Sequence, residues 1–462
     1  MSATGTGATG TGTGGVGGDA TARATGTGAN RTGATGTGGP LAGIRGIVLT
    51  QAWAGAYCTQ LLGMLGADIV QLEVRRRLDS WRGSYDTPMP AALSAIPTAK
   101  HAWNCNPLFN SVNLNKRSVT LDLATPAGID VFKRLLVHAD VVAENFSPRV
   151  LGNLGIGYDA MRAVKPDVIL CSLSAYGHDG PWANVPGIGG TIEPTSGQSA
   201  LLGYRDGPPL NSGQMYPDAV AGLTGFAALV TALRHRRRTG EGQCIDLSMQ
   251  EANLAVVGDA ALEQVLTGRQ RERLGNRHLT FAPHGIYPCR DRASGDAGIP
   301  GRERWIALAA ESEAQWTALC AAAGHPDWLA DPRFAGNAAR KANEDALDAL
   351  IAGWTAGEDR DALARRLAAV GVIAAPVLDT LEVAADAHFR ARGVIVDVDH
   401  PEVGSRAQPG VPVHFSRTPG GVTRPAPVQG EHNLEVFSEL LGMSEDEYDT
   451  LARDGVSGVG EP

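Results

Sequence analysis

The feature that most constrains the fold is an alternation of strand-like and helix-like segments that begins near Gly43. IRGIVLT (44–50) has the pattern of a buried strand, and AGAYCTQLLGMLG (54–66) has the pattern of a helix that ends at a glycine. ADIVQLE (67–73) then has the pattern of a second strand. Strand, helix and strand in this order predict one βαβ unit with parallel strands.

The same order returns further along the chain. RSVTLDL (117–123), TPAGIDVFKRLLVHA (125–139) and DVVAEN (140–145) predict a second unit, whose helix starts with an N-cap threonine followed by proline. Residues 157–177 add a further short helix and a strand. Together these segments predict an α/β fold with a parallel, doubly wound sheet.

Composition and pattern divide the chain into five parts. Residues 1–39 are almost all Gly, Thr and Ala and cannot bury enough apolar surface to offset their ordering entropy, so we expect a disordered tail. Residues 40–270 hold the alternating segments of a large domain, and the Gly, Pro, Asp and Arg of residues 271–300 predict a connection. Residues 301–395 predict a smaller, mostly helical domain. Strands and a closing helix in residues 396–462 are expected to return to the large domain.

Charge and cysteine usage narrow the class of protein. The formal net charge of −9 gives no general electrostatic reason to bind nucleic acid or an anionic membrane. The 6 cysteines form no CxxC pair and no cluster with histidine, which is typical of a reduced cytosolic protein without a metal site. The sequence shows neither a signal-like N-terminus nor a run of about 18 apolar residues. We therefore expect a soluble, cytoplasmic protein.

Asp218 is the most informative polar residue. It precedes an apolar segment, residues 219–233, that predicts a helix buried on most sides, in which Gly222 and Gly225 let a neighbouring backbone approach. Asp is a preferred N-cap residue, so the residues alone favour a structural cap. A capping carboxylate is also kept ionised by backbone N–H groups, and an ionised carboxylate can be a nucleophile. The two roles are compatible.

Three other segments follow predicted strands, where ligands of open α/β sheets bind. They are the small-residue turn at Trp53, the polar and aromatic ENF segment (144–146), and Arg75 to Arg77, which could meet phosphates. Taken singly, each has a structural alternative that is favoured: a tight turn, a core aromatic and a solvated loop. The histidines form no HExxH or Ser/His/Asp motif.

Seven segments, taken in order, carry a resemblance to a known family. The segments are LAGIRGIVLTQAWAGAYCTQLLGMLGADIVQLE (41–73), NKRSVTLDLATPAG (115–128), ADVVAENFSP (139–148) with VLGNLGIGYD (150–159), KPDVILCSLSAYGHDGPW (165–182), PDAVAGLTGFAALVTALRHRRRTGEGQCIDLSMQEA (217–252), DPRF (331–334) and GEHNLEVFSELLG (430–442). Over about residues 40–445 the chain resembles the class III CoA-transferase family (CaiB/BaiF type). That family includes formyl-CoA transferase, carnitine-related CoA-transferase and α-methylacyl-CoA racemase.

The resemblance implies roles for particular residues. Asp218, just before the helix that leads into R..TG.GQ, matches the family's nucleophile. The family implies two interlocked subunits, either identical or paralogous, each with a large Rossmann-like domain and a smaller α/β domain, and an active site near the subunit interface. The residues implied to contact CoA are Trp53, Ala54, Leu121, Asn145, Phe146 and Ser147, with Arg75 and Arg76 as candidates for its phosphates, although Val74 occupies one likely aligned position.

The function implied is transfer of CoA between carboxylic acids, with acyl-CoA and a free acid as the small-molecule substrates and no metal, ATP or nucleotide cofactor. Asp218 would form anhydride and CoA-thioester intermediates in turn. Backbone N–H groups of Gly187, Gly189 and Gly190 are candidates for stabilising the oxyanions, and a loop that covers the site is the alternative.

Three other functions were weighed. A 2-methylacyl-CoA racemase or epimerase of the same family would use a His/Asp pair, but Ile188 falls at the histidine position and cannot exchange a proton. A noncatalytic CoA-binding subunit of a heteromer would not need Asp218. A nicotinamide dehydrogenase would need a G-x-G-x-x-G turn after the first strand, which the sequence lacks.

Overall fold

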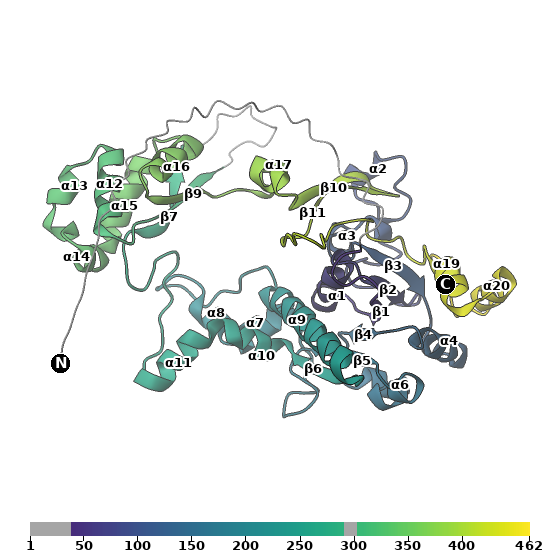
Figure 1. Cartoon of the computed structure of the whole chain (residues 1–462). Coiled ribbons are helices and arrows are strands. Elements are labelled where there is room, and N and C mark those ends of the chain that lie inside the picture. Colours follow the sequence, from purple (N-terminus) through teal and green to yellow (C-terminus); the bar gives the residue numbers. More distant parts are fainter. Residues whose placement is uncertain (1–37, 291–302) are drawn as a thin grey trace, which may run out of the picture. The chain divides into compact units, whose positions relative to one another are not determined.

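The computed structural model describes residues 38–290 and 303–462. Most of the predicted tail (1–39) and the second part of the predicted connection (271–300) lie outside the described residues. The main element is a six-stranded sheet in the order β3-β2-β1-β4-β5-β6, and every neighbouring pair is parallel (Figure 1). The strands are β1 (Arg45–Leu49), β2 (Asp68–Glu73), β3 (Lys116–Thr120), β4 (Val141–Glu144), β5 (Ile169–Ser174) and β6 (Cys244–Ser248). The predicted α/β fold is confirmed.

Both faces of this sheet are covered, which explains the apolar run Ile47–Leu49 in β1. Ile47 and Leu49 belong to one core cluster and Val48 to another on the opposite face. The first cluster contains side chains of α4 (Pro126–Leu136), α6 (Tyr158–Val164) and α19 (Asn433–Leu441). The second contains side chains of α1 (Ala54–Met64) and α9 (Tyr216–Thr239). Because the chain winds outward from β1 to β3 and then from β4 to β6, the strand order reverses between β1 and β4, where α/β proteins bind ligands.

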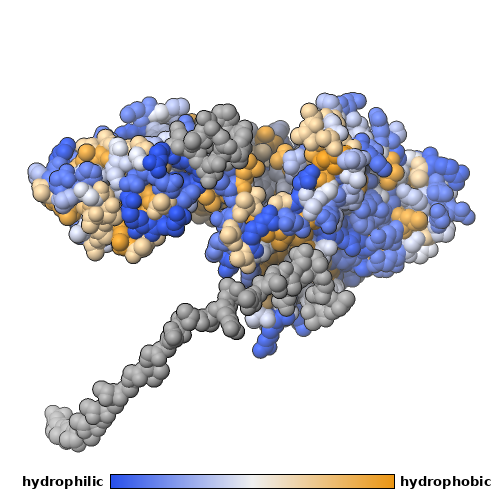
Figure 2. All heavy atoms as spheres, turned by 90° about the horizontal axis from the view of Figure 1, so that it is seen from above, coloured by the Kyte–Doolittle hydropathy of each residue, from blue (hydrophilic) through white to orange (hydrophobic). Residues whose placement is uncertain are grey.

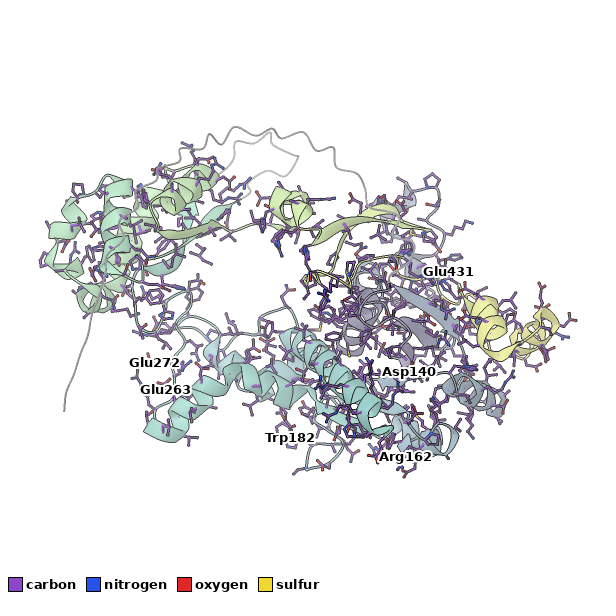
Figure 3. The ribbon with its side chains drawn as sticks, viewed as in Figure 1. Asp140, Arg162, Trp182, Glu263, Glu272 and Glu431 are labelled. Carbon is purple, nitrogen blue, oxygen red and sulfur yellow. The ribbon has the colours of Figure 1, made fainter. Side chains whose placement is uncertain are left out.

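Helices α1 and α9 pack closely because small residues lie between them. A Cβ atom added at Gly222 would lie 2.9 Å from the carbonyl oxygen of Ala54, and one at Gly225 would lie 3.0 Å from Leu173 Cδ2. At the other end of α9, Arg236 forms a 2.5 Å ion pair with Asp140, which is labelled in Figure 3. The tight approach predicted from the two glycines is therefore present.

The predicted burial of α9 on most sides is wrong. Its buried residues lie along one face, and Leu223 on another face is 51% exposed. Among the described residues, α9 is also the helix long and apolar enough to span a membrane: it has 24 residues, and an 18-residue stretch of it has a mean hydropathy of 1.3. Because α9 packs on α1 and β5, its apolar composition is that of a core helix.

A separate core is built around a three-stranded antiparallel sheet in the order β7-β8-β9. Its largest fully buried side chain is Trp316. The elements of this part are β7 (His284–Cys289), β8 (Arg304–Ala309), α12 (Glu313–Ala323), α13 (Asp327–Ala330), η3 (Pro332–Phe334), α14 (Asn337–Ala342), α15 (Glu344–Thr355), α16 (Arg360–Ala369) and β9 (Ile373–Pro376).

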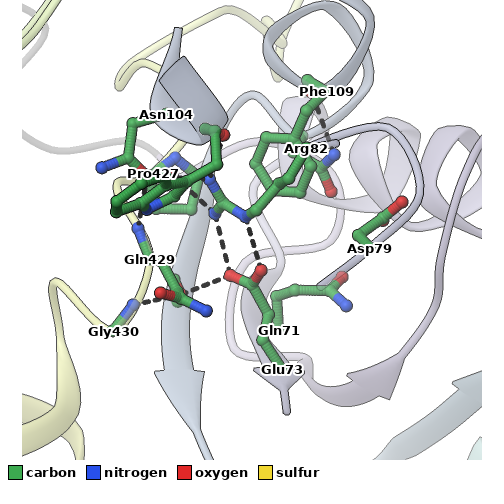
Figure 4. Close-up of polar contacts among 12 residues, drawn as sticks. Gln71, Glu73, Asp79, Arg82, Asn104, Phe109, Pro427, Gln429 and Gly430 are labelled. Carbon is green, nitrogen blue, oxygen red and sulfur yellow. Dashed lines mark hydrogen bonds and ion pairs between the residues drawn. The ribbon is translucent and has the colours of Figure 1, made fainter. Parts of the chain in front are cut away.

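The C-terminal part contains an antiparallel pair, β10 (Ile395–His400) and β11 (Gly404–Pro409), and ends in α19 and α20 (Glu445–Arg453). Figure 4 shows how it is fastened to the main sheet: the buried Arg82 pairs with Glu73 of β2 at 2.6 Å and donates to the carbonyl oxygen of Pro427 at 3.0 Å. The exact domain boundaries stay predictions.

The remaining elements are short. On the face seen in Figure 2, hydrophobic residues are interspersed with hydrophilic ones. The short elements are α2 (Ala91–Ser94), η1 (Ala102–Asn104), α3 (Pro107–Val112), α5 (Val150–Asn153), α7 (Gly189–Thr195), α8 (Gln198–Leu201), α10 (Met249–Leu254), η2 (Ala255–Val257), α11 (Gly258–Thr267), α17 (Thr380–Ala385) and α18 (Ala387–Ala391). The alternating pattern did not predict α2, α3, α7 or α8.

Candidate active site

The turn from β1 into α1 is held by side chains from two other segments. Asn145, just after β4, accepts from the backbone N–H of Gln51 at 2.7 Å and donates to the carbonyl oxygen of Gln51 at 2.8 Å. Both carboxylate oxygens of Asp79 accept from the backbone N–H of Ala52 at 3.0 Å. Ala52 has a left-handed conformation, with φ of 52°, which is unfavourable for alanine unless the surroundings fix it. Asn145 and Asp79 provide that restraint.

The buried side chain of Gln71 on the neighbouring strand β2 also holds the residue that precedes this turn. Gln71 of β2 donates to the carbonyl oxygen of Thr50 at 2.6 Å and accepts from the hydroxyl of Thr50 at 2.9 Å. Lys116 donates to Gln71 at 3.3 Å and to Asn113 at 2.8 Å, and burial lowers the pKa of its ammonium to about 7. These bonds fix the carboxyl end of β1, from which the turn starts.

The ENF segment reaches the same edge of the sheet. Phe146 donates its backbone N–H to Glu144 at 2.6 Å, and burial raises the pKa of the Glu144 carboxyl to about 7. The ring of Phe146 is partly buried against the core and also lines the cavity described below. Both predictions for this ring, core packing and a position at the sheet edge, therefore hold geometrically.

Asp218 lies in the first turn of α9, but it is not the N-cap. The helix begins at Tyr216 with Met215 as its N-cap in the left-handed region, and Asp218 donates its backbone N–H to the carbonyl oxygen of Met215 at 3.0 Å. The capping role favoured by the residues alone is wrong, because Pro217 can occupy an early helical position and moves the start of the helix upstream. The carboxylate is thereby free to face the cavity.

The surroundings of the Asp218 carboxyl group destabilise its ionised form. Its Oδ2 atom is buried and has no hydrogen-bond partner among the described residues. Burial raises its pKa from 3.8 to about 6, against the opposing effect of the backbone N–H groups of Ala54 and of Asp218 itself. Gly189 leaves the space that this carboxylate fills, since a Cβ atom there would lie 2.0 Å from Oδ2. An ionised, under-solvated carboxylate is a stronger nucleophile than a hydrated one.

This raised pKa predicts a stability effect. Between the unfolded pKa of 3.8 and the folded value of about 6, the folded state binds more protons, so the free energy of unfolding falls as pH rises and stays lowered above pH 6. Asp218→Asn, which carries no charge, should therefore raise stability at pH 8 by about 1–3 kcal/mol and much less at pH 4.5. Thermal unfolding of both proteins at the two pH values measures this. An equal change in Tm at both would contradict it.

These elements enclose a cavity of about 360 Å³. Asp218 lies in its wall together with the residues of the β1–α1 turn and the ENF segment. The candidates from the sequence that line it are Asn145, Phe146, Ser147, Gly187, Gly189 and Asp218. The structure thus brings together residues that are far apart in the sequence.

Other candidates lie outside its lining. Trp53 packs against the lining residue Trp81, with ring centroids 5.7 Å apart and the rings tilted by 37°. Ala54 is buried but directs its backbone N–H to Asp218. Leu121 is 1% exposed within the core, so its side chain is not available to a ligand in this structure. Gly190 lies beside the lining, and its carbonyl oxygen accepts from Asn211 at 2.9 Å.

The two arginines suggested for phosphates have other partners. The guanidinium of Arg75 donates to the carbonyl oxygens of Ser457, Gly460 and Glu461 at 2.8–3.0 Å, and Arg76 pairs with Asp122. Neither lines the cavity. Arg75 and Arg76 are thus engaged by protein groups in this structure, and their role at a phosphate stays a prediction.

Several lining residues were not identified from the sequence as part of the site. They include Gln51, Ala52, Ser80, Trp81, Val185, Met215 and Met249. Tyr176 also lines the cavity and contacts Trp182 edge to face, with ring centroids 5.3 Å apart. Trp182 lies on the loop between β5 and α7, as Figure 3 shows. The position of Gln51 and Ala52 directly after β1 was the available signal.

Comparisons with known proteins identify relatives of this chain. The sequence model of CoA-transferase family III matches residues 41–433. The chain is 34% identical to the succinyl-CoA–D-citramalate CoA-transferase of Chloroflexus aurantiacus over 89% of this chain and 96% of that protein. It is 30% identical to a formyl-CoA:oxalate CoA-transferase of Bradyrhizobium diazoefficiens over 90% of this chain and 96% of that protein. Its fold is similar to that in the crystal structure of a CaiB/BaiF family protein from Brucella suis, with a TM-score of 0.76 and 30% sequence identity. The similarity covers 87% of this chain and 100% of that chain.

Proposed function

The chain belongs to CoA-transferase family III, and from this premise we propose that it moves CoA from an acyl-CoA to a free carboxylic acid through covalent intermediates on Asp218. One observation carries the proposal: a carboxylate with a buried, unpartnered oxygen faces a cavity at the reversal point of the sheet. CoA-transferase activity itself follows from the relatives, whereas the route through Asp218 is the proposal.

The first half of the reaction loads CoA onto the enzyme. A carboxylate oxygen of Asp218 attacks the thioester carbonyl carbon of the donor, and the C–S bond breaks to give a mixed anhydride and CoA thiolate. The thiolate then attacks the Asp218 carbonyl carbon of the anhydride. This step releases the donor as a free carboxylate and leaves an Asp218–CoA thioester.

The second half returns CoA to an acceptor. The acceptor carboxylate attacks the Asp218 thioester carbonyl carbon, which forms a second anhydride and frees the thiolate. Attack of the thiolate on the acceptor acyl carbon gives the product acyl-CoA and restores the Asp218 carboxylate. Each bond made is balanced by one broken, so these steps require neither ATP nor a redox partner.

Backbone N–H groups beside Asp218 could stabilise the oxyanions that form in these steps. Gly189 and Gly190 begin α7, and a side chain at Gly189 would overlap the carboxylate. The N–H group of Ala54 at the start of α1 also approaches Asp218. We assign these amides as the oxyanion donors, and Gly187 to the loop that closes the wall near Tyr176.

Binding of CoA is proposed along the β1–α1 turn and the ENF segment. Phe146 and Ser147 contribute to the lining directly, whereas Asn145 acts through the backbone of Gln51. We further propose a cytoplasmic protein that works with a second subunit, either its own copy or a paralogue. One relative, 31% identical, is the β subunit of a succinyl-CoA–L-malate CoA-transferase of Chloroflexus aurantiacus.

The racemase alternative fits less well. Proton exchange at an α-carbon needs an acid and a base on opposite faces of the substrate, whereas Asp218 is the one formally charged side chain among the described residues that line the cavity. Ile188, at the position where a histidine would be required, is apolar and lines the cavity beside Gly189. Transfer requires one nucleophilic carboxylate, which is present.

Trapping with hydroxylamine tests the proposal. Incubation of the protein with an acyl-CoA and hydroxylamine should convert the activated Asp218 carbonyl to a hydroxamate, because both the anhydride and the thioester react with this nucleophile. Mass spectrometry of the peptide that contains Asp218 detects the product, and omission of the acyl-CoA is the control. Absence of label at Asp218 during measurable transfer would refute the mechanism.

A further inference from the structure

Part of the cavity wall around Asp218 is formed by apolar side chains that are unusually exposed for their type. Ile188 is 68% exposed, Val185 46% and Met215 39%. All three line the cavity, together with Tyr176 and Met249. Large apolar side chains that gather in an open cavity, rather than singly on the surface, commonly contact a ligand. Their arrangement therefore bears on which acyl group reacts at Asp218.

Ile188 and Met215 lie beside the reactive carboxylate. Gly189 follows Ile188, and a Cβ atom at Gly189 would lie 2.0 Å from Asp218 Oδ2 and 2.7 Å from Met215 Cβ. The backbone of residues 188–189 and the start of α9 thus meet at the carboxylate. An acyl carbon bonded to an Asp218 oxygen has its remaining substituent within reach of these side chains.

The charges around the cavity also favour an acyl group without a second carboxylate. Asp218 is the only side chain with a formal charge among the described residues of its lining. Two buried cations near the β1–α1 turn have other partners: Arg82 pairs with Glu73, and Lys116 bonds to Gln71 and Asn113. A second carboxylate on the substrate would lie near Asp218 and would be repelled by it, without a cation in the lining to offset that repulsion.

Resting on the proposed transferase function, we propose that the acyl group is apolar: the site takes monocarboxylic acids with a branched or aromatic chain, and Ile188 is a specificity-determining contact. The named relatives act on succinyl, citramalate, formyl or oxalate groups, so this substrate class differs from theirs. The apolar group would displace water from Ile188, Val185 and Met215, whereas a dicarboxylate would have to desolvate its second charge there.

A matched pair of thioesters tests this substrate class. In 4-methylpentanoyl-CoA an isopropyl group stands where succinyl-CoA has its second carboxylate, so the two differ in charge at similar shape. The rate of hydroxamate formation at Asp218 is measured with each thioester separately, which needs no acceptor acid. We expect 4-methylpentanoyl-CoA to be preferred at least about 10-fold. Equal rates, or a preference for succinyl-CoA, would overturn the proposal.

Variants locate the effect at Ile188. Ile188→Arg should lower the preference for the apolar thioester at least about 10-fold, because the guanidinium would pair with the succinyl carboxylate. Val137→Arg is the matched control: Val137 is 52% exposed, ends α4 and does not line the cavity, so the preference should be unchanged. The same ratio in both variants would refute the role of Ile188. Failure of both thioesters to label Asp218 would overturn the substrate class, whereas measurable CoA transfer without label at Asp218 would refute the proposed function.

Discussion

Replacing Asp218 with alanine is expected to lower kcat/KM for CoA transfer by about 10⁴-fold or more, because each of the four proposed steps forms or breaks a bond to the Asp218 carboxyl group. The described lining of the cavity offers no second carboxylate in its place. The measurement is a mass-spectrometric assay of product acyl-CoA with a panel of donors and acids. The panel is needed because the relatives differ in their substrates.

Asp218→Asn is the matched control for this experiment. It keeps the shape of the side chain and removes the nucleophile, so it should be as inactive as the alanine variant. Both variants should fold, because removal of a buried charge with an unpartnered oxygen does not weaken the native state. Substantial exchange by either folded variant would show that another group carries the acyl or CoA intermediate.

Replacing Gly189 with alanine is expected to have the second largest effect, a decrease in kcat/KM of about 10²-fold. The added Cβ atom would lie 2.0 Å from Asp218 Oδ2 and 2.7 Å from Met215 Cβ, so either the carboxylate or the start of α7 must move. One of the atoms that must move is the proposed nucleophile. Displacement of a reacting group by about 1 Å is enough for a loss of this size.

Gly190→Ala provides the matched control. A Cβ atom at Gly190 meets nothing within 4 Å, and both glycines lie in the first turn of α7. Alanine also retains the backbone N–H at each position, so a proposed oxyanion donor is not lost. Steady-state kinetics should show nearly unchanged activity for Gly190→Ala. Equal losses in the two variants would indicate an effect on α7 itself and would contradict the steric argument.

The fold was largely predictable because its main strands carry local signals. β1 carries the apolar run Ile47–Leu49 since Ile47 and Val48 face different helix layers, and Thr125 accepts from Gly128 as the predicted N-cap of α4. The short helices α2, α3, α7 and α8 were not predicted. They are too short to show a helical period, and α7 even contains Pro194.

The site was predictable in part, for a different reason. Asn145, Phe146 and Asp218 were identified, the last by its family motif, and all three line the cavity. The partner of Arg75 was not predictable, because it is the backbone near the C-terminus. The phosphate role of Arg75 was inferred from its position after a strand. That position indicates at which edge of the sheet the residue lies, but not which distant segment its side chain contacts.

The sequence by itself determined the parallel α/β sheet, the family and the aspartate to test, because these depend on local periodicity and on motifs of neighbouring residues. Only the tertiary structure decided how Asp218 is used. Burial, in which Gly189 takes part, raises the pKa of its carboxyl, and the amide of Ala54 opposes that rise; these residues are 29 and 164 positions away in the chain. Burial and electrostatic coupling depend on distance in space, and chain folding sets that distance.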